Sequence, residues 1–142
     1  MGLQLTRGGE YAIRAMTYLA RRPVGEISAL RDVGHEQDIP ESFLAKIFQS
    51  LVRAGLVASQ RGARGGFSLA RPAAEITVRE VIEAVDGPIS LNVCVLWPDD
   101  CERSPECTMH RVWLEAQKRM MEVLGDVTLE GLVVGREVVA TS

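Results

Sequence analysis

The spacing of apolar residues predicts three helices in the first part of the chain. The first runs from Glu10 to Arg21, and apolar or aromatic residues three or four positions apart form one face of it: Tyr11, Ala15, Tyr18 and Leu19. Ser28 is a suitable N-cap for a short second helix that ends near His35. A third helix begins at Ile39-Pro40-Glu41-Ser42, since proline suits the first helical turn, and ends at Gly55. Its apolar residues follow the same spacing: Phe43, Leu44, Ile47, Leu51 and Val52.

Two short apolar segments follow the third helix. Leu56–Ser59 and Phe67–Ala70 flank a glycine-rich segment that contains Arg61 and Arg64. This pattern predicts a β-hairpin. Helices followed by a hairpin are the element order of a winged helix-turn-helix, in which one helix enters the major groove of DNA and the hairpin lies along the backbone or reaches the minor groove. The predicted fold class is therefore mainly α with a small β-hairpin wing.

The second part of the chain contains two more predicted helices. One leads from Ile76 to about Val85, and Asp86-Gly87-Pro88 ends it. The other is long and starts at Met109, with apolar or small residues alternately four and three positions apart: Met109, Trp113, Ala116, Met120, Val123 and Val127. This heptad-like seam favours a dimerisation helix that pairs with a second copy of the chain, as suits two DNA half-sites. The alternative is that the seam packs inside its own monomer.

Charge is divided unevenly along the 142 residues, whose net charge is −3. Residues 1–71 carry ten Lys and Arg against six Asp and Glu, whereas residues 72–142 carry six against thirteen. The first part has a net charge of +4 and is suited to facing phosphate. The remainder has a net charge of −7 and is expected to face away from it. The sequence shows no secretory signal pattern and no apolar stretch long enough to span a bilayer. We therefore expect a cytoplasmic protein with no membrane partner.

Several polar residues are candidates for contacting DNA. Ser42, Lys46 and Gln49 lie four and three positions apart, so they share one face of the third helix and offer groups that bond phosphates or base edges. The hairpin tip contributes Arg61, Arg64 and Gly65. The alternatives are that the helix residues are ordinary solvated surface and that the glycines serve only the turn.

A cluster of metal-ligating residues precedes and begins the long helix. It contains all three cysteines and one of the two histidines: Cys94, Cys101, Cys107 and His110. Three thiols in a reducing cytosol cannot all pair as disulfides, and thiolates with an imidazole suit an iron-sulfur cluster or zinc. A structural zinc site and an iron-sulfur electron-transfer protein are the rival interpretations. No second constellation indicates catalysis, so we expect neither an enzyme nor a small-molecule substrate.

Several segments, spread over nearly the whole chain, form a recognisable pattern. They are Leu5-Thr6, Glu10-Tyr11-Ala12, Phe43-Leu44 through Leu51, Ala54–Val57, Arg61–Ala70, Ile76–Val78, Val81–Val85, the cysteine cluster and Val127–Leu132. The most specific part is the Arg-Gly-x-x-Gly-Gly wing followed by three cysteines. Together these segments resemble the Rrf2 family of winged-helix bacterial repressors.

This resemblance implies a homodimeric transcriptional repressor that binds near-palindromic promoter DNA and carries an iron-sulfur cluster. By the same comparison, Arg61 enters the minor groove, and Ser42 and Lys46 lie at the DNA. Cluster loss, oxidation or nitric oxide would then alter DNA affinity, which makes the protein a redox sensor. Base preference need not transfer from the relatives, because Ala45 stands where related members have an acidic residue.

The resemblance also implies that the three cysteines are cluster ligands, and it leaves two candidates for the fourth ligand. His110 matches the histidine that holds a 2Fe-2S cluster in some members, whereas Glu10 matches a carboxylate that the partner subunit supplies to a 4Fe-4S cluster in others. We favour His110 and a 2Fe-2S cluster, because Cys107 and His110 are three residues apart at the start of one helix. One departure is the first cysteine interval, which has six residues here and five in the histidine-ligated members.

The sequence thus predicts five consecutive regions. They are a winged helix-turn-helix (1–71), a connecting helix (72–90), a cluster-binding loop (91–108), a dimerisation helix with a C-terminal segment (109–133) and a flexible tail (134–142).

Overall fold

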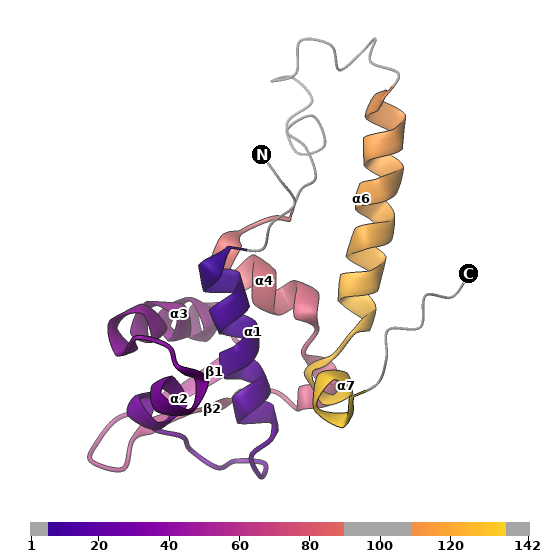
Figure 1. Cartoon of the computed structure of the whole chain (residues 1–142). Helices are drawn as coiled ribbons and strands as arrows, with labels where there is room; N and C mark the ends of the chain where they lie inside the picture. Colours follow the sequence, from indigo (N-terminus) through magenta and orange to yellow (C-terminus); the bar gives the residue numbers. More distant parts are fainter. Residues whose placement is uncertain (1–5, 90–108, 136–142) are drawn as a thin grey trace.

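The computed structural model describes residues 6–89 and 109–135. Helices dominate, with a two-stranded antiparallel hairpin, as the sequence predicted (Figure 1). In chain order the elements are α1 (Arg7–Ala20), α2 (Leu30–Gln37), α3 (Glu41–Arg53), β1 (Val57–Gln60), β2 (Gly66–Leu69), the 3₁₀ turn η1 (Ala73–Glu75), α4 (Val78–Asp86), α6 (Met109–Asp126) and α7 (Leu129–Val134).

Helix α1 begins three residues before the predicted start at Glu10. Thr6 is its N-cap, and the Thr6 hydroxyl accepts a hydrogen bond from the backbone N–H of Gly9 at 3.0 Å. Two glycines in the first turn are weak helix formers. However, Gly9 is buried, and a Cβ at Gly8 would lie 3.3 Å from Val85 of α4. Close packing against α4 therefore accounts for the small residues at the start of α1.

Helices α2 and α3 form the helix-turn-helix pair. Asp38 ends α2 in the left-handed conformation (φ 54°), and its backbone N–H donates to the carbonyl of His35 at 3.4 Å. Ile39 is buried at the turn, and α3 starts directly after Pro40. The predicted beginning of α3 is thus confirmed.

The wing is a short antiparallel hairpin, and one residue outside it, Ser28, pairs with its second strand. Val57 pairs with Leu69 and Gln60 with Gly66, so each strand is shifted by one residue from its prediction. Ser28 was expected to be the N-cap of α2, but that position belongs to Ala29. Ser28 is buried instead, and its backbone exchanges two hydrogen bonds of 2.8 Å with Phe67. The prediction for Ser28 was wrong because this pairing spans 39 residues and no local capping pattern reveals it.

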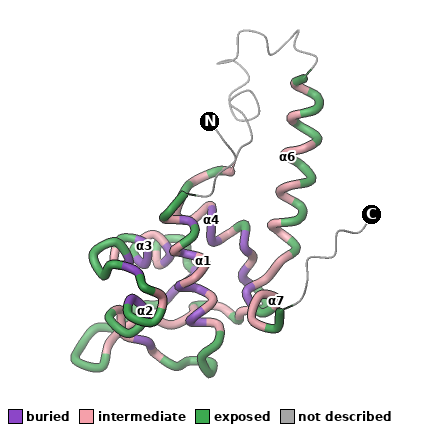
Figure 2. Tube along the Cα trace, viewed as in Figure 1, coloured by how far each residue is buried: buried purple, intermediate pink, exposed green. Residues whose placement is uncertain are grey.

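One apolar core joins the winged region to the end of the described chain (Figure 2). Helix α1 crosses the core and packs against α2, α3, α4 and α7. The side chains of Met16, Phe48, Ile76 and Leu129 are fully buried, although Leu129 comes from α7, far along the sequence. Helix α7 is therefore part of the same folded unit as the wing.

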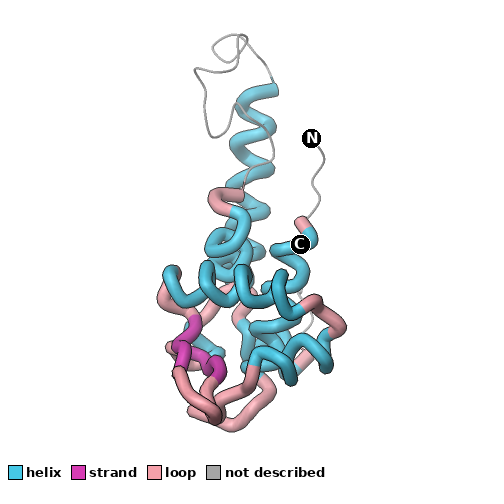
Figure 3. The backbone as a smooth tube through the Cα atoms, turned by 90° about the vertical axis from the view of Figure 1, so that its left-hand side faces the viewer, coloured by secondary structure: helices cyan, strands magenta, loops and turns pink. Residues whose placement is uncertain are grey.

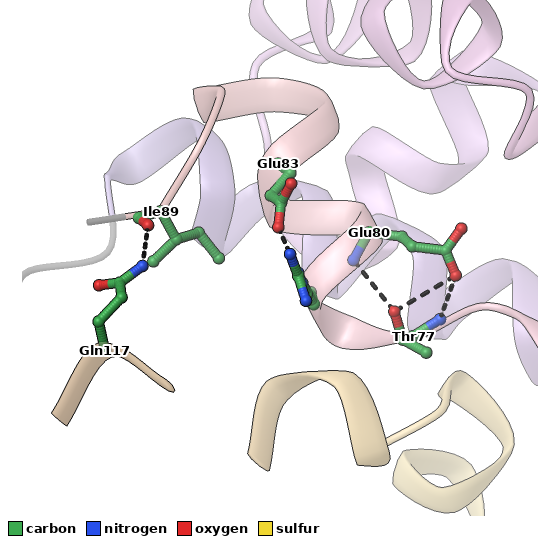
Figure 4. Close-up of polar contacts among 6 residues, drawn as sticks. Thr77, Glu80, Glu83, Ile89 and Gln117 are labelled. Carbon is green, nitrogen blue, oxygen red and sulfur yellow. Dashed lines mark hydrogen bonds and ion pairs between the residues drawn. The ribbon is translucent and has the colours of Figure 1, made fainter. Parts of the chain in front are cut away.

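A capping box and a strand-like bridge fix the start of α4. The Thr77 hydroxyl accepts from the N–H of Glu80, and a carboxylate oxygen of Glu80 accepts from the N–H of Thr77 (Figure 4). Thr77 also forms an isolated antiparallel bridge with Thr128, in which the N–H of Val78 donates to the carbonyl of Val127 at 2.9 Å. The junction between α6 and α7 is thereby attached to the first turn of α4.

Helix α6 is the one long helix that contributes no buried residue to the described part of the core. None of its 18 residues is buried, and it rises past α4 so that its first turns stand clear of the other helices (Figures 1 and 2). The amide of Gln117 donates to the carbonyl of Ile89 at 2.5 Å, which holds the middle of α6 beside the end of α4 (Figure 4). In the view turned by 90°, the hairpin lies at the opposite end of the molecule from the start of α6 (Figure 3).

No helix within residues 6–89 and 109–135 is long and apolar enough to cross a membrane.

Candidate nucleic-acid interface and metal centre

The polar face of α3 points to solvent. Ser42, Lys46 and Gln49 are all exposed, as their spacing predicted. The opposite face is fixed in the core by four buried residues: Leu44, Ile47, Phe48 and Leu51. Among the described residues Lys46 has no ion-pair partner, so its ammonium group is available to an external anion. The arrangement presents a hydroxyl, an ammonium and an amide along one side of a rigidly seated helix.

The wing tip carries two cations on a tightly packed backbone. Arg61 and Arg64 are exposed, and neither has a carboxylate partner in the part of the chain that the structure describes. A Cβ at Gly65 would lie 2.2 Å from the carbonyl oxygen of Gln60, so only glycine fits this position. The fold of the hairpin alone therefore explains why residue 65 is glycine, and Gly65 does not by itself indicate contact with DNA.

The base of the wing is anchored on the underside of α3. Phe67 in β2 stacks on Phe48 in α3, with ring centroids 4.2 Å apart and planes inclined by 14°. Because aromatic stacking and the Ser28 pairing both act on Phe67, the hairpin is held in one position relative to α3. The wing and the exposed face of α3 thus belong to one rigid surface.

Phe43 departs from the sequence prediction, which placed it with the apolar face of the third helix. Its side chain is 40% exposed in the first turn of α3, and its ring meets the ring of Tyr11 edge-on, with centroids 5.4 Å apart and planes at 86°. The guanidinium of Arg14 lies 5.5 Å from the centre of the Tyr11 ring and donates to the carbonyl of Gln37. The helical spacing did not reveal this exposure, because Phe43 lies at the edge of the apolar stripe, where a side chain can face either the core or solvent.

An ion pair connects the end of the wing to α4. Arg71 follows β2 and its guanidinium contacts the Glu80 carboxylate at 2.5 Å, with both side chains more than one-third exposed. Partial burial raises the pKa of Glu80, but hydrogen bonds from Arg71 and Thr77 and the charge of Arg71 together outweigh it. The net effect lowers the pKa of Glu80 below its ordinary value. Glu80 therefore contributes both a helix cap and a link to the wing.

The three predicted thiolate ligands, Cys94, Cys101 and Cys107, lie outside the described residues. Within the described residues, no three His, Cys, Asp or Glu side chains come close enough together to hold a metal ion. The ligand set, including the choice between His110 and Glu10, therefore stays a prediction from the sequence.

His110 lies in the first turn of α6, and one of its ring nitrogens fits a ligand role. The Nδ1 atom is shielded from solvent and has no hydrogen-bond partner in the described part of the chain. A buried polar atom without a partner is costly, and a bound ion is one arrangement that would satisfy it. An imidazole nitrogen is a known ligand in 2Fe-2S chemistry.

Glu10, the alternative ligand, is exposed in the first turn of α1. It has no ion-pair partner among the described residues. A carboxylate in this position also interacts favourably with the N-terminal end of the helix dipole. Its exposure leaves it accessible to a second copy of the chain.

The predicted dimer seam lies on α6 and is incompletely covered. Met109 is 44% and Val123 46% exposed. Trp113, Ala116 and Met120 are partly exposed, and nearby Val112 and Leu114 are exposed by 52% and 42%. Two of the five seam residues, Met109 and Val123, are therefore exposed, and the other three are partly exposed.

Comparison with known proteins gives one consistent result. The family model Rrf2, described as an iron-dependent transcriptional regulator, matches residues 5–135. The HTH-type transcriptional regulator IscR of Xenorhabdus nematophila is 36% identical over 136 residues, covering 96% of this chain and 82% of that protein. CymR, the global cysteine regulator of B. subtilis, has a solved structure with a TM-score of 0.77 and 29% identity, covering 95% of this chain and 99% of that one. The structure of T. potens IscR gives a TM-score of 0.72 at 29% identity, over 100% and 94% of the two chains. These relatives are transcriptional regulators, not enzymes.

Proposed function

Since this chain belongs to the Rrf2 family of transcriptional regulators, we propose that it is a homodimeric repressor whose affinity for promoter DNA depends on the state of an iron-sulfur cluster. In this proposal α3 enters the major groove and the wing follows the backbone, with Arg61 in the minor groove. The expected location is the cytoplasm, where promoter DNA lies.

The observation that carries the proposal is the surface formed by α3 and the wing. It combines an exposed polar helix face with three cations that have no partner among the described residues, namely Lys46, Arg61 and Arg64. A cationic side chain that has no ion-pair partner within the protein gains the most free energy from binding phosphate. Its binding releases counterions from the DNA, and no existing ion pair has to be broken. Ser42 and Gln49 supply the uncharged hydrogen-bonding groups that base edges require.

The exposed apolar seam of α6 supports dimerisation. None of the residues of α6 is buried, and its seam residues repeat at coiled-coil spacing: Met109, Trp113, Ala116, Met120 and Val123. A second copy related by a two-fold axis would cover this seam and present two recognition surfaces. Such a dimer matches a near-palindromic site.

The cluster would be held by Cys94, Cys101, Cys107 and His110, and we favour the 2Fe-2S type. The shielded, unpartnered Nδ1 of His110 supports this set. When bound, such a cluster supplies a redox-active and chemically labile centre, whose potential and lability depend on its non-thiolate ligand. If Glu10 of the partner subunit takes the place of His110, a 4Fe-4S cluster is the alternative.

The chain's own contacts suggest how a change at the ligand loop reaches the wing. His110 lies at the start of α6, whereas the end of α6 is bonded to α4 through Val127 and Val78. Helix α4 in turn carries Glu80, which binds Arg71 at the end of the wing. A displacement of α6 would therefore alter the balance between two arrangements of the winged units in the dimer.

The test is to purify the protein anaerobically, count iron and sulfide, record the visible spectrum, and measure DNA affinity with and without the cluster at one salt concentration. About two irons per monomer and a His110→Ala variant with an altered spectrum are expected. His35→Ala is the matched control, because His35 is the chain's other histidine and is exposed on α2. About four irons, with the spectrum sensitive to Glu10→Gln, would favour the alternative ligand. A colourless zinc protein, or equal DNA affinity in the two states, would contradict cluster sensing.

A further inference from the structure

The recognition helix exposes an aromatic ring among its polar side chains. Phe43 directly follows Ser42 in the first turn of α3 and is 40% exposed. Its neighbour three residues on is Lys46, on the same side of the helix. An apolar ring therefore lies beside the hydroxyl, ammonium and amide groups of the same surface.

The Phe43 ring lies against Tyr11 of α1, outside the buried core. The Tyr11 ring contacts the Phe43 ring edge-on, and the guanidinium of Arg14 lies over the Tyr11 ring. Arg14 also donates to the carbonyl of Gln37 at the end of α2, so the α1 residues that support the ring are bonded to the helix-turn-helix itself. The exposed part of the Phe43 ring is thus presented in a fixed orientation at the beginning of α3.

The chemistry that fits a fixed apolar ring in the major groove is the C5-methyl group of thymine. The first residues of a recognition helix are the ones that reach base edges. Thymine is the only base that offers an apolar group in the major groove, and phenylalanine is among the side chains that contact it. Phosphate and sugar offer no comparable gain to a phenyl ring.

We propose that Phe43 is a specificity-determining residue that contacts the methyl group of one thymine in each half-site. This inference rests on the proposed DNA-binding function and adds a base preference to it. Tyr11 acts as a positioning residue, because its ring meets the Phe43 ring edge-on.

The experiment replaces each thymine of a bound duplex in turn by deoxyuridine, which removes only the methyl group. The duplex is first enriched by the wild-type protein from a random-sequence library, and affinities are measured by fluorescence anisotropy at fixed salt. At one thymine per half-site the wild type should lose about fourfold in affinity, the equivalent of one buried methyl group. Phe43→Ala should bind the unmodified duplex more weakly and show no loss at that thymine.

Two further variants keep the result interpretable. Val24→Ala removes a fully exposed apolar side chain in the loop after α1, outside α3 and the wing, and should keep the wild-type pattern. Phe43→Leu retains apolar bulk should Phe43→Ala fail to fold, and its sensitivity to the methyl group should be reduced. Thermal unfolding of each variant separates loss of folding from loss of contact.

The outcomes distinguish this inference from the function on which it rests. A protein that binds its duplex but is indifferent to every thymine methyl group would overturn the role of Phe43 and leave DNA binding intact. The same holds if Phe43→Ala keeps the wild-type loss at one thymine. A protein that enriches no duplex, with or without its cluster, would overturn the proposed function and this inference together.

Discussion

Replacing Gly66 with alanine tests whether backbone pairing holds the wing to the helical body. A Cβ at this position would lie 2.2 Å from the carbonyl oxygen of Ser28, and real Cβ atoms essentially never approach a heavy atom within 3.0 Å. The obstacle is backbone and not a flexible side chain, so β2 and Ser28 must move apart by about 1 Å.

The expected cost follows from the bonds that this movement breaks. The backbones of Ser28 and Phe67 exchange two hydrogen bonds of 2.8 Å beside Gly66. Each contributes about 0.5–1.5 kcal/mol, and Ser28 is buried, so water does not readily replace the lost partners. Gly66→Ala should therefore lower the free energy of unfolding by about 1–3 kcal/mol.

Urea unfolding followed by circular dichroism, at one protein concentration, measures this difference. Gly125→Ala is the matched control, because the same change in α6 meets only the Cδ atom of Arg79 at 3.9 Å. In a helix this change should be neutral or stabilise by up to about 1 kcal/mol. If Gly66→Ala were as stable as the wild type, the pairing of the wing with Ser28 would not hold the wing in place.

Three further perturbations test other parts of the molecule. Leu129→Ala should lower the free energy of unfolding by about 2–5 kcal/mol in the same urea assay, since the side chain is fully buried; a loss under about 1 kcal/mol would show that α7 is dispensable to the core. Glu80→Gln should cost at most about 1 kcal/mol at neutral pH. Because folding lowers the pKa of Glu80, the carboxylate stabilises the folded state above its ordinary pKa of 4.5, and this stabilisation is lost as the pH falls through the lower pKa of the folded state. The urea midpoints of the wild type, measured from pH 7 to pH 3, should therefore converge with those of Glu80→Gln. Midpoints that stay equally far apart at every pH would contradict a stabilising role for the Glu80 carboxylate. Arg61→Gln should reduce the slope of log affinity against log salt by about one, and an unchanged slope would argue against the proposed place of Arg61 at the DNA.

Periodic spacing predicted most of the helices because burial itself is periodic. In α3 the buried residues recur three and four positions apart, which is the pattern that the sequence displays. The start of α1 was missed because glycine is a poor helix former, and Gly8 and Gly9 are small for a reason that only packing against α4 reveals.

Long-range pairing is what the sequence could not disclose. Serine is a residue type that commonly caps helices, yet the backbone of Ser28 pairs with that of Phe67, a residue far along the chain. The exposure of Ser42, Lys46 and Gln49 could be predicted, because polar residues on one helical face normally meet water. Phe43 could not be assigned in this way, since its position at the edge of the apolar stripe is compatible with either side.

Two attachments hold α6 beside α4, one at its middle and one just after its end. The N–H of Val78 bonds to the carbonyl of Val127 just after the helix, and the Gln117 amide bonds to the carbonyl of Ile89 at its middle. Between Gln117 and Met109 the helix extends about 12 Å beyond the second attachment, at about 1.5 Å per residue. A tilt of about 10° in this part would move the end that bears His110 by only about 2 Å, so the two attachments limit how far His110 can shift relative to α4.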